Sequence, residues 1–378
     1  MKPVTLFAFF KATQAMLVPS PPGPYHVAVK NLELVDQIRI DHFAPEPNTK
    51  RRIMVSAYLP VEAHHRCKAQ IVPYMPPLTA GVFSSLGASL GIPNGTIESF
   101  NMEFCDLSTI KPKKGHRSKE FQVAIFSPGA QGTRLVYGAM ARSLASMGCI
   151  ILALDHTYET LVVEFPDGSA AYATTGNTSA LVMLEARTKD VSFITSQLSN
   201  KTLTNNLFAH FPGTFNPDKV AVYGHSFGGS TAAVTVQRDH RVLGGLNLDG
   251  PIYGPVNHQW FKDKPFVLVG VDGDNGSEWD EFYGKIDASK MELKFFKTQH
   301  YAFTDVPSLL EKVNVPPESQ SIIDETFGTL DGRGVEKATN EAMVGLMDLL
   351  FTNNSKTLER IGEYANIQVL RSDLVKNS

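Results

Sequence analysis

The sequence predicts an α/β fold built on a mostly parallel sheet with helices on both faces. From residue 121 onward, short apolar runs alternate with amphipathic segments. The apolar runs are nearly continuous, as expected of strands that are buried on both faces. Apolar residues at helical spacing follow most of these runs, and this alternation of strand and helix is typical of parallel sheets.

The predicted elements follow one another in a regular order. Strands are expected at 121–126, 150–154, 220–223, 243–248, 265–271 and, as the last strand, 291–296. Helices are expected at 134–147, at 182–198, from about 227, and at 336–351, where the last helix closes the fold. Two earlier strands are expected at 36–43 and 51–60, the second stopped by Pro60. Residues of about 72–100 are rich in proline and glycine and predict a loop or short-helix insertion.

Composition excludes several classes of protein. The chain has 378 residues, of which 43% are hydrophobic and 19% charged, as is ordinary for a globular protein with a sizeable core. The net charge of −3 comes without a basic stripe, so no nucleic-acid partner is expected. No run approaches the ~20 apolar residues of a transmembrane segment. We expect residues 25–378 to form a single domain.

The first 24 residues resemble a signal peptide or a loosely ordered leader. Lys2 precedes the apolar stretch 4–10, and residues 12–15 could hold a signal-peptidase site, although Lys11 interrupts the apolar core. Five N-glycosylation sequons begin at Asn94, Asn177, Asn200, Asn275 and Asn353. Secretion is therefore predicted, with a cytoplasmic location as the alternative.

Three cysteines are too few for a disulfide scaffold. Cys149 opens an apolar run and is predicted to be a buried thiol. Cys67 and Cys105 flank the insertion and could pair in an oxidising compartment, but the sequence leaves this open. No group of histidines and cysteines has metal-ligand spacing, so neither a metal site nor a cofactor is predicted.

A nucleophile motif follows the strand predicted at 220–223. Gly224-His225-Ser226-Phe227-Gly228-Gly229 fits the pattern G-x-S-x-G and opens a helix. At such a strand-to-helix turn the serine is strained and exposed, and glycines on either side prevent a clash. The motif predicts an α/β-hydrolase fold with Ser226 as nucleophile and the N–H of Phe227 as one oxyanion donor. We expect His225 to pack beside the turn rather than act as the base.

The acid and the base must follow the serine, in that order, in this fold. His300 lies shortly after the strand 291–296 and is favoured as the base over His258, which lies in a loop rich in proline and glycine. Asp249 ends one predicted strand, and Asp272 ends the next and is followed by Asp274. Either strand end can present a carboxylate, so the residue pattern alone does not choose the acid.

At these residues the sequence resembles the secreted platelet-activating factor acetylhydrolase family, a calcium-independent phospholipase A2 group. The resemblance covers about residues 74–350. It is most specific at 224–229, 248–251, 126–130 and 299–305. It implies Asp249 as the acid and the N–H of Ala130 as the second oxyanion donor. One departure is Pro128, where human-type members carry histidine.

The resemblance implies a serine esterase that cleaves the sn-2 short-chain ester of a phospholipid without a cofactor. A broad carboxylesterase or polyester-type hydrolase, a peptidase of the same fold and a non-catalytic binding module are the alternatives. The insertion carries Val82, Phe83, Leu86 and Leu90 with almost no charge. It would either pack on the core or make a transient contact with a lipid surface.

Overall fold

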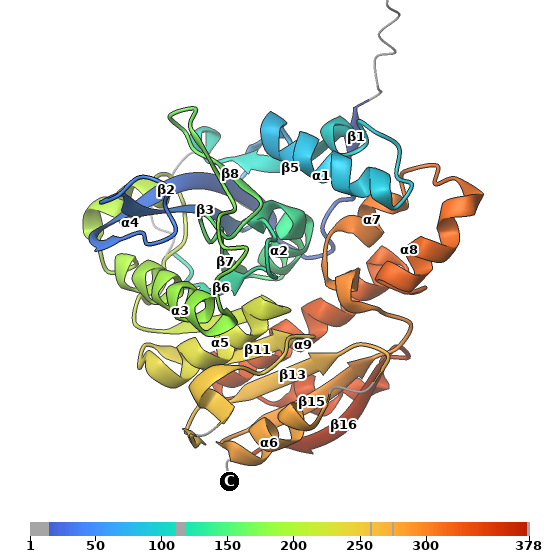
Figure 1. The fold of residues 1–378 in the computed structure, drawn as a ribbon. Helices are drawn as coiled ribbons and strands as arrows, with labels where there is room; N and C mark the ends of the chain where they lie inside the picture. Colours follow the sequence, from blue (N-terminus) through green and yellow to red (C-terminus); the bar gives the residue numbers. More distant parts are fainter. Residues whose placement is uncertain (1–14, 111–117, 258, 274–275, 376–378) are drawn as a thin grey trace, which may run out of the picture.

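The centre of the fold is a nine-stranded sheet (Figure 1). The structure is a computed structural model, and it describes residues 15–110, 118–257, 259–273 and 276–375. Its strand order is β16-β15-β13-β11-β10-β6-β7-β3-β2. Six neighbouring strands are parallel: β7 (Cys149–Leu154), β6 (Gln122–Ser127), β10 (Val220–His225), β11 (Val242–Leu248), β13 (Phe266–Gly270) and β15 (Lys290–Phe295). The edges are antiparallel, formed by β3 (Lys50–Val61) and β2 (His26–Ile40) on one side and β16 (Ile367–Asp373) on the other. The predicted α/β class with a mostly parallel sheet is confirmed.

Helices cover both faces of this sheet, and each face has its own hydrophobic core. Along β6, Ala124 and Phe126 belong to one core and Val123 and Ile125 to the other, because successive side chains point to opposite faces. The first core includes residues of α2 (Gly138–Ser146) and α9 (Gly332–Thr352). The second includes residues of α3 (Ala180–Gln197), α5 (Phe227–Arg238) and α6 (Ser277–Lys285).

Three expectations were wrong at the edges of the sheet. The strand expected as the last, at 291–296, is β15, and β16 follows α9 and pairs antiparallel with it. β16 was missed because only Ile367 among its residues is buried, and its second half is polar. β3 runs through Pro60, since β7 pairs only with Val55–Tyr58 and no ladder partner on that side needs the missing N–H. β2 begins at His26, ten residues before the predicted start.

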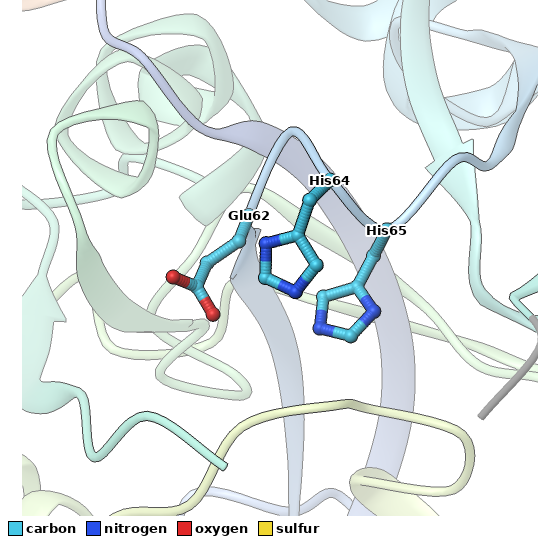
Figure 2. A group of neighbouring side chains, drawn as sticks. All are labelled: Glu62, His64 and His65. Carbon is cyan, nitrogen blue, oxygen red and sulfur yellow. The ribbon is translucent and has the colours of Figure 1, made fainter. Parts of the chain in front are cut away.

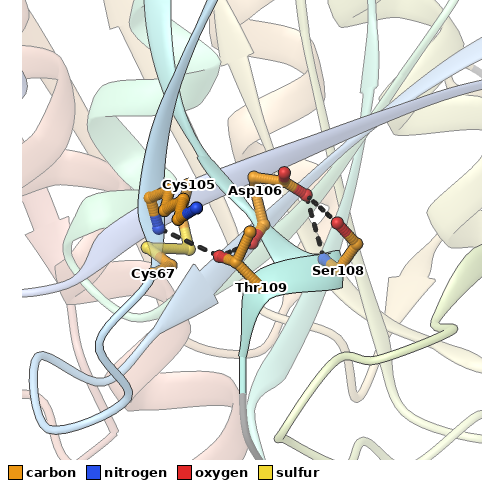
Figure 3. The surroundings of a disulfide bond; sticks show 6 residues. Cys67, Cys105, Asp106, Ser108 and Thr109 are labelled. Atoms are coloured by element: carbon orange, nitrogen blue, oxygen red, sulfur yellow. Dashed lines mark hydrogen bonds between the residues drawn. A yellow bond between two sulfur atoms is a disulfide. The ribbon is translucent and has the colours of Figure 1, made fainter.

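A second, three-stranded sheet of order β1-β5-β4 lies beside the insertion. It contains β1 (Met16–Leu17), β4 (Lys68–Pro73) and β5 (Phe100–Asp106), and α1 (Pro77–Ser89) lies between β4 and β5 in the chain. A disulfide joins Cys67 to Cys105 at the start of β4 and the end of β5 (Figure 3). The pairing that the sequence left open is therefore present, while Cys149 is the predicted buried thiol. Burial raises the pKa of the Cys149 thiol to about 12.

The described part of the expected leader, from residue 15, is attached to the rest of the fold. Met16 and Leu17 pair with Phe100 and Asn101, and the N–H of Gly23 donates to the Ser146 hydroxyl over 2.9 Å. Met16, Leu17 and Gly23 are therefore held by hydrogen bonds rather than loosely ordered. Residues 1–14 lie outside the described ranges. Within the described residues, no helix combines the length and the apolar character that crossing a membrane requires.

Candidate active site

Ser226 occupies the sharp turn between β10 and α5. Its backbone has φ 55° and ψ −127°, a conformation that non-glycine residues adopt at a cost of about 1–3 kcal/mol. The turn is so tight that a Cβ on Gly228 would lie 2.0 Å from the Ser127 carbonyl oxygen. Glycine is therefore the residue that this position accommodates. Because Ser226 directly follows β10, it lies at the carboxyl edge of the parallel strands.

The structure brings Ser226, His300 and Asp249 into one chain of hydrogen bonds. His300 Nε2 lies 3.0 Å from Ser226 Oγ, and His300 Nδ1 lies 2.6 Å from Asp249 Oδ2. His300 opens the 3₁₀ turn η5 (His300–Phe303), five residues beyond the end of β15, and Asp249 directly follows β11. With Nδ1–H donating to the carboxylate, Nε2 is left to accept the serine proton. Ser226 is partly exposed and the side chain of His300 is 38% exposed, so solvent can reach the Ser226 end of this hydrogen-bond chain.

The competing acid and base candidates lie elsewhere or outside the described residues. Asp272 follows β13 and is exposed, and its Oδ2 accepts the backbone N–H of Lys297 over 2.8 Å. It thus contacts the loop that leads to His300 rather than the imidazole. Asp274 and His258 lie outside the described residues.

A buried asparagine, which was not among the residues expected at the site, shapes the turn that carries Asp249. Asn247 Oδ1 accepts the N–H of Gly250, and Asn247 Nδ2 donates to the Gly250 carbonyl, both over 2.8 Å. The indole N–H of Trp279 donates to the same carbonyl over 3.0 Å. These bonds fix Gly250, the residue after Asp249. The backbone of Asp249 itself has φ 49°.

The two predicted oxyanion donors belong to two segments that meet at Ser226: Phe227 follows it directly, and Ala130 follows Gly129, where an added Cβ would lie 3.3 Å from Ser226 Cβ. Phe227 is the first residue of α5, where a backbone N–H has no intrahelical acceptor. In the segment of Ala130, Arg187 donates to the carbonyls of Pro128 and Gly129 over 2.7 and 3.1 Å. Because a trans peptide directs its C=O and N–H oppositely, the N–H of Ala130 points away from Arg187. Since Arg187 contacts the Pro128 carbonyl, the proline's missing N–H does not weaken this contact.

Arg187 itself belongs to a buried polar network at the loop of Pro128 and Gly129. Its guanidinium pairs with Glu159, and both side chains are at most 4% exposed. Nearby, His156 bridges Ser127 Oγ and Asp190 Oδ2, with both distances 2.9 Å. This second Ser-His-Asp arrangement is fully buried, so no ester can reach it. Burial opposes ionisation of Asp190, but Arg51 and His156 still hold its pKa well below the usual range.

A further chain of hydrogen bonds connects the loop of Gly129 with the loop of His300. The N–H of Gly129 donates to Tyr137 Oη over 3.3 Å, and Tyr137 Oη lies 2.9 Å from His225 Nδ1. His225 Nε2 lies 2.8 Å from the carbonyl oxygen of His300, which can only accept. His225 is therefore neutral, with the proton on Nε2 and with Nδ1 accepting the Tyr137 hydroxyl. Burial first, and then the nearby His300, lower the pKa of His225 to about 3.

Asp305 anchors the other end of the His300 turn. Its carboxylate accepts the backbone N–H groups of Ala139 and Met140 over 2.7 and 3.0 Å and the hydroxyl of Tyr74 over 2.8 Å. Burial raises the pKa of Asp305 to about 7, against the effect of these donors. The turn of His300 is thus held by the start of α2 as well as by His225.

We expect Tyr137→Phe to lower kcat while leaving KM nearly unchanged. The variant leaves the Gly129 N–H and His225 Nδ1 without their partner, and displacement of a catalytic group by about 1 Å can cost on the order of 100-fold in rate. Each buried orphan also costs about 1–3 kcal/mol in unfolding free energy. Steady-state kinetics and thermal unfolding measure the two effects. Tyr172→Phe is the matched control, because Tyr172 is exposed in β9 (Ala170–Tyr172). An unchanged kcat for Tyr137→Phe would contradict a positioning role.

Known proteins resemble this chain in sequence and in fold. The family model described as platelet-activating factor acetylhydrolase, isoform II, matches residues 87–194 and 180–273, which include Ser226 and Asp249. A probable 1-alkyl-2-acetylglycerophosphocholine esterase from Arthroderma benhamiae is 28% identical over 322 residues, or 79% of this chain and 78% of that protein. The chain belongs to the platelet-activating factor acetylhydrolase family.

Relatives named platelet-activating factor acetylhydrolase share shorter regions with this member of the family. The protein of Cavia porcellus is 29% identical over 48% of this chain and 45% of its own length. That of Bos taurus is 28% identical over 41% of this chain and 40% of its own length. A solved ferulic acid esterase from Streptomyces cinnamoneus has a TM-score of 0.74 at 22% identity, covering 94% of this chain and all of that one, and shows the same fold. Because its family and its sequence relatives are named acetylhydrolase or esterase, the chain is a carboxylic ester hydrolase.

Proposed function

We propose that this chain hydrolyses the short sn-2 acyl ester of a glycerophospholipid, using Ser226, His300 and Asp249 as a catalytic triad. The observation that carries the proposal is the pair of contacts made by the His300 imidazole. Its Nε2 lies 3.0 Å from Ser226 Oγ, and its Nδ1 lies 2.6 Å from Asp249 Oδ2. The substrate class rests on the family and on the printed name of the Arthroderma benhamiae relative.

The reaction is acyl transfer in two halves. His300 Nε2 removes the proton of Ser226 as Oγ forms a bond to the ester carbonyl carbon, and Asp249 stabilises the resulting imidazolium. The N–H groups of Phe227 and Ala130 hold the negative charge on the former carbonyl oxygen. The C–O bond to the lysophospholipid then breaks, and His300 returns the proton to that leaving oxygen. In the second half, His300 deprotonates water, which attacks the acyl-enzyme, releases the short carboxylic acid and restores the Ser226 hydroxyl.

Two partly exposed aromatic rings lie beside these residues and support an amphiphilic ester as substrate. Tyr301 is 52% exposed and its ring lies edge-on to His300, with centroids 5.1 Å apart. Tyr253 is 42% exposed and its ring meets that of Phe227 at a centroid distance of 6.1 Å. Apolar parts of a lipid could pack on such rings, while the scissile ester meets the hydroxyl.

The insertion is a candidate contact for lipid. Phe83 of α1 is partly buried against the core, whereas Leu78 and Leu86 of the same helix are 38% and 48% exposed. α1 therefore packs on the fold with one side and offers apolar side chains on the other. We include a transient contact of this helix with a lipid surface in the proposal.

A panel of substrates tests the proposed specificity. We expect kcat/KM for a 1-alkyl-2-acetyl phosphocholine to exceed that for its long-chain sn-2 analogue by at least tenfold, equivalent to about 1.4 kcal/mol of activation free energy. Assays with monomeric and vesicle-bound substrate separate the effect of the surface from that of the acyl chain. If p-nitrophenyl acetate and long-chain esters were cleaved as well as the acetyl phospholipid, the activity would be that of a broad carboxylesterase.

Secretion is the second part of the proposal. The Cys67–Cys105 disulfide is favoured by an oxidising compartment, and the sequon asparagines Asn94, Asn177, Asn200 and Asn353 are all exposed. Asn275 lies outside the described residues. β1 begins at Met16, so cleavage after Ala15 would leave it intact. The mass and N-terminal residue of protein recovered from the medium of a secreting host test this, and an uncleaved chain retained in the cells would contradict it.

A further inference from the structure

Three side chains with metal-binding atoms meet on the turn between β3 and β4. Glu62, His64 and His65 each offer one ligand atom, and these atoms all lie within 4.8 Å of one another. Figure 2 shows the carboxylate and the two imidazoles extending to the same side of the turn. Glu62 and His65 are partly buried and His64 is exposed, so an ion could enter from solvent.

The shape of the turn explains why two adjacent histidines can share a ligand. In a strand, neighbouring side chains point to opposite faces, so adjacent histidines would diverge. Here the backbone N–H of His65 donates to the Glu62 carbonyl over 2.8 Å and closes the turn. The two imidazole rings consequently lie with centroids 4.0 Å apart and planes inclined by 39°. No metal site was expected from the sequence, because two adjacent histidines can share a ligand only where a turn brings their side chains to one side.

Both ends of the turn are fixed. Val61, which precedes Glu62, is fully buried at the end of β3. Cys67, two residues after His65, is joined to Cys105 on β5. An ion binding here would therefore meet ligands that are already held close together, and little ordering of the backbone would oppose binding.

We propose that Glu62, His64 and His65 bind a zinc ion, with water in the fourth position. Two imidazoles and one carboxylate are a donor set that zinc takes in proteins, with ligands at about 2.0–2.2 Å from the ion. Ligand atoms around such an ion lie roughly 3.3 Å apart in a tetrahedron, so side-chain rotations must shorten the longest separation. Calcium and magnesium take oxygen ligands and do not fit two imidazoles.

The zinc site lies at the opposite edge of the sheet from the triad. β3 is antiparallel to β7, and Tyr58, near the end of β3, pairs with Ile151, near the start of β7. The turn after β3 is thus at the amino edge of the parallel strands, whereas Ser226 follows the carboxyl end of β10. A zinc ion on this turn stabilises the fold by binding the folded state, and takes no part in the proposed ester hydrolysis.

Zinc titration of the purified, metal-free protein tests the proposal. We expect calorimetry to show one equivalent of bound Zn²⁺, and the melting temperature to rise with zinc concentration. Co²⁺ in place of zinc should give the absorption bands of a tetrahedral site. Ca²⁺ and Mg²⁺ at the same concentrations should change neither the heat signal nor the melting temperature.

Single substitutions test whether zinc binding takes place at this turn. His64→Ala and His65→Ala should each abolish it, and Glu62→Gln should weaken it by at least about tenfold, since loss of even an outer-shell partner typically costs about 10–100-fold. His240→Ala is the matched control, because His240 is exposed and lies beyond α5. Melting without zinc checks that every variant is folded. The proposal is overturned if the wild type binds no zinc saturably, or if His64→Ala and His65→Ala bind it as the wild type does.

Discussion

Ser226→Ala is expected to lower kcat by about 10⁶-fold, the scale seen when a serine hydrolase loses its nucleophile. The hydroxyl is the atom that forms the acyl-enzyme, and no other described hydroxyl meets both His300 Nε2 and solvent in the same way. Any remaining catalysis would come from the oxyanion donors and from substrate binding. Alanine keeps the same backbone strain at φ 55°, so the unfolding free energy should change by less than about 1 kcal/mol.

Labelling with a fluorophosphonate probe gives this prediction a second measurement. The probe should modify the wild-type protein at Ser226 and should leave Ser226→Ala unlabelled. Ser85→Ala is a suitable control, because it removes an exposed hydroxyl from α1 and leaves Ser226 untouched. An alanine variant at 226 that kept most of the esterase activity, or that was still labelled, would rule out Ser226 as nucleophile. It would leave the ester hydrolase class of the chain intact.

The position of Ser226 could be predicted because its signal is local. The strand, the glycine-flanked turn and the helix all lie within residues 220–238, so their pattern is read without knowing the tertiary structure. β16 could not be predicted in the same way, since an edge strand with one exposed side carries little periodic apolar signal. Local sequence therefore predicts the central strands better than the edges.

The residues around Ser226 and His300 depend on contacts that sequence spacing does not reveal. Tyr137 and His225 are 88 residues apart, and Arg187 contacts the carbonyl of Pro128 from 59 residues away. Nothing in the local pattern of α3 distinguishes Arg187 from a surface arginine, and only burial and the pairing with Glu159 do so. Polar networks of this kind become visible only once the sheet and its helices are assembled.

The choice of acid shows the same limit and leads to the second large prediction, on Asp249→Asn. Asp249 and Asp272 each follow a strand of the sheet, and residue pattern alone could not separate them. In the structure Asp249 contacts the imidazole over 2.6 Å, while Asp272 accepts a backbone N–H from Lys297. An asparagine at 249 can donate to Nδ1 and so favour the tautomer with a proton on Nε2, which cannot accept the serine proton. We expect kcat to fall by about 10⁴-fold.

Asp272→Asn is the matched control for this substitution, because it makes the same chemical change one strand away. Its amide oxygen can still accept the Lys297 N–H, so the loop that leads to His300 should hold its position and activity should stay within about threefold, or under about 1 kcal/mol, of the wild type. Steady-state kinetics on an acetate ester compares the two variants directly. If Asp272→Asn were the inactive one and Asp249→Asn the active one, the acid would be at the end of β13, and the contact of Asp249 with His300 would have only a structural role.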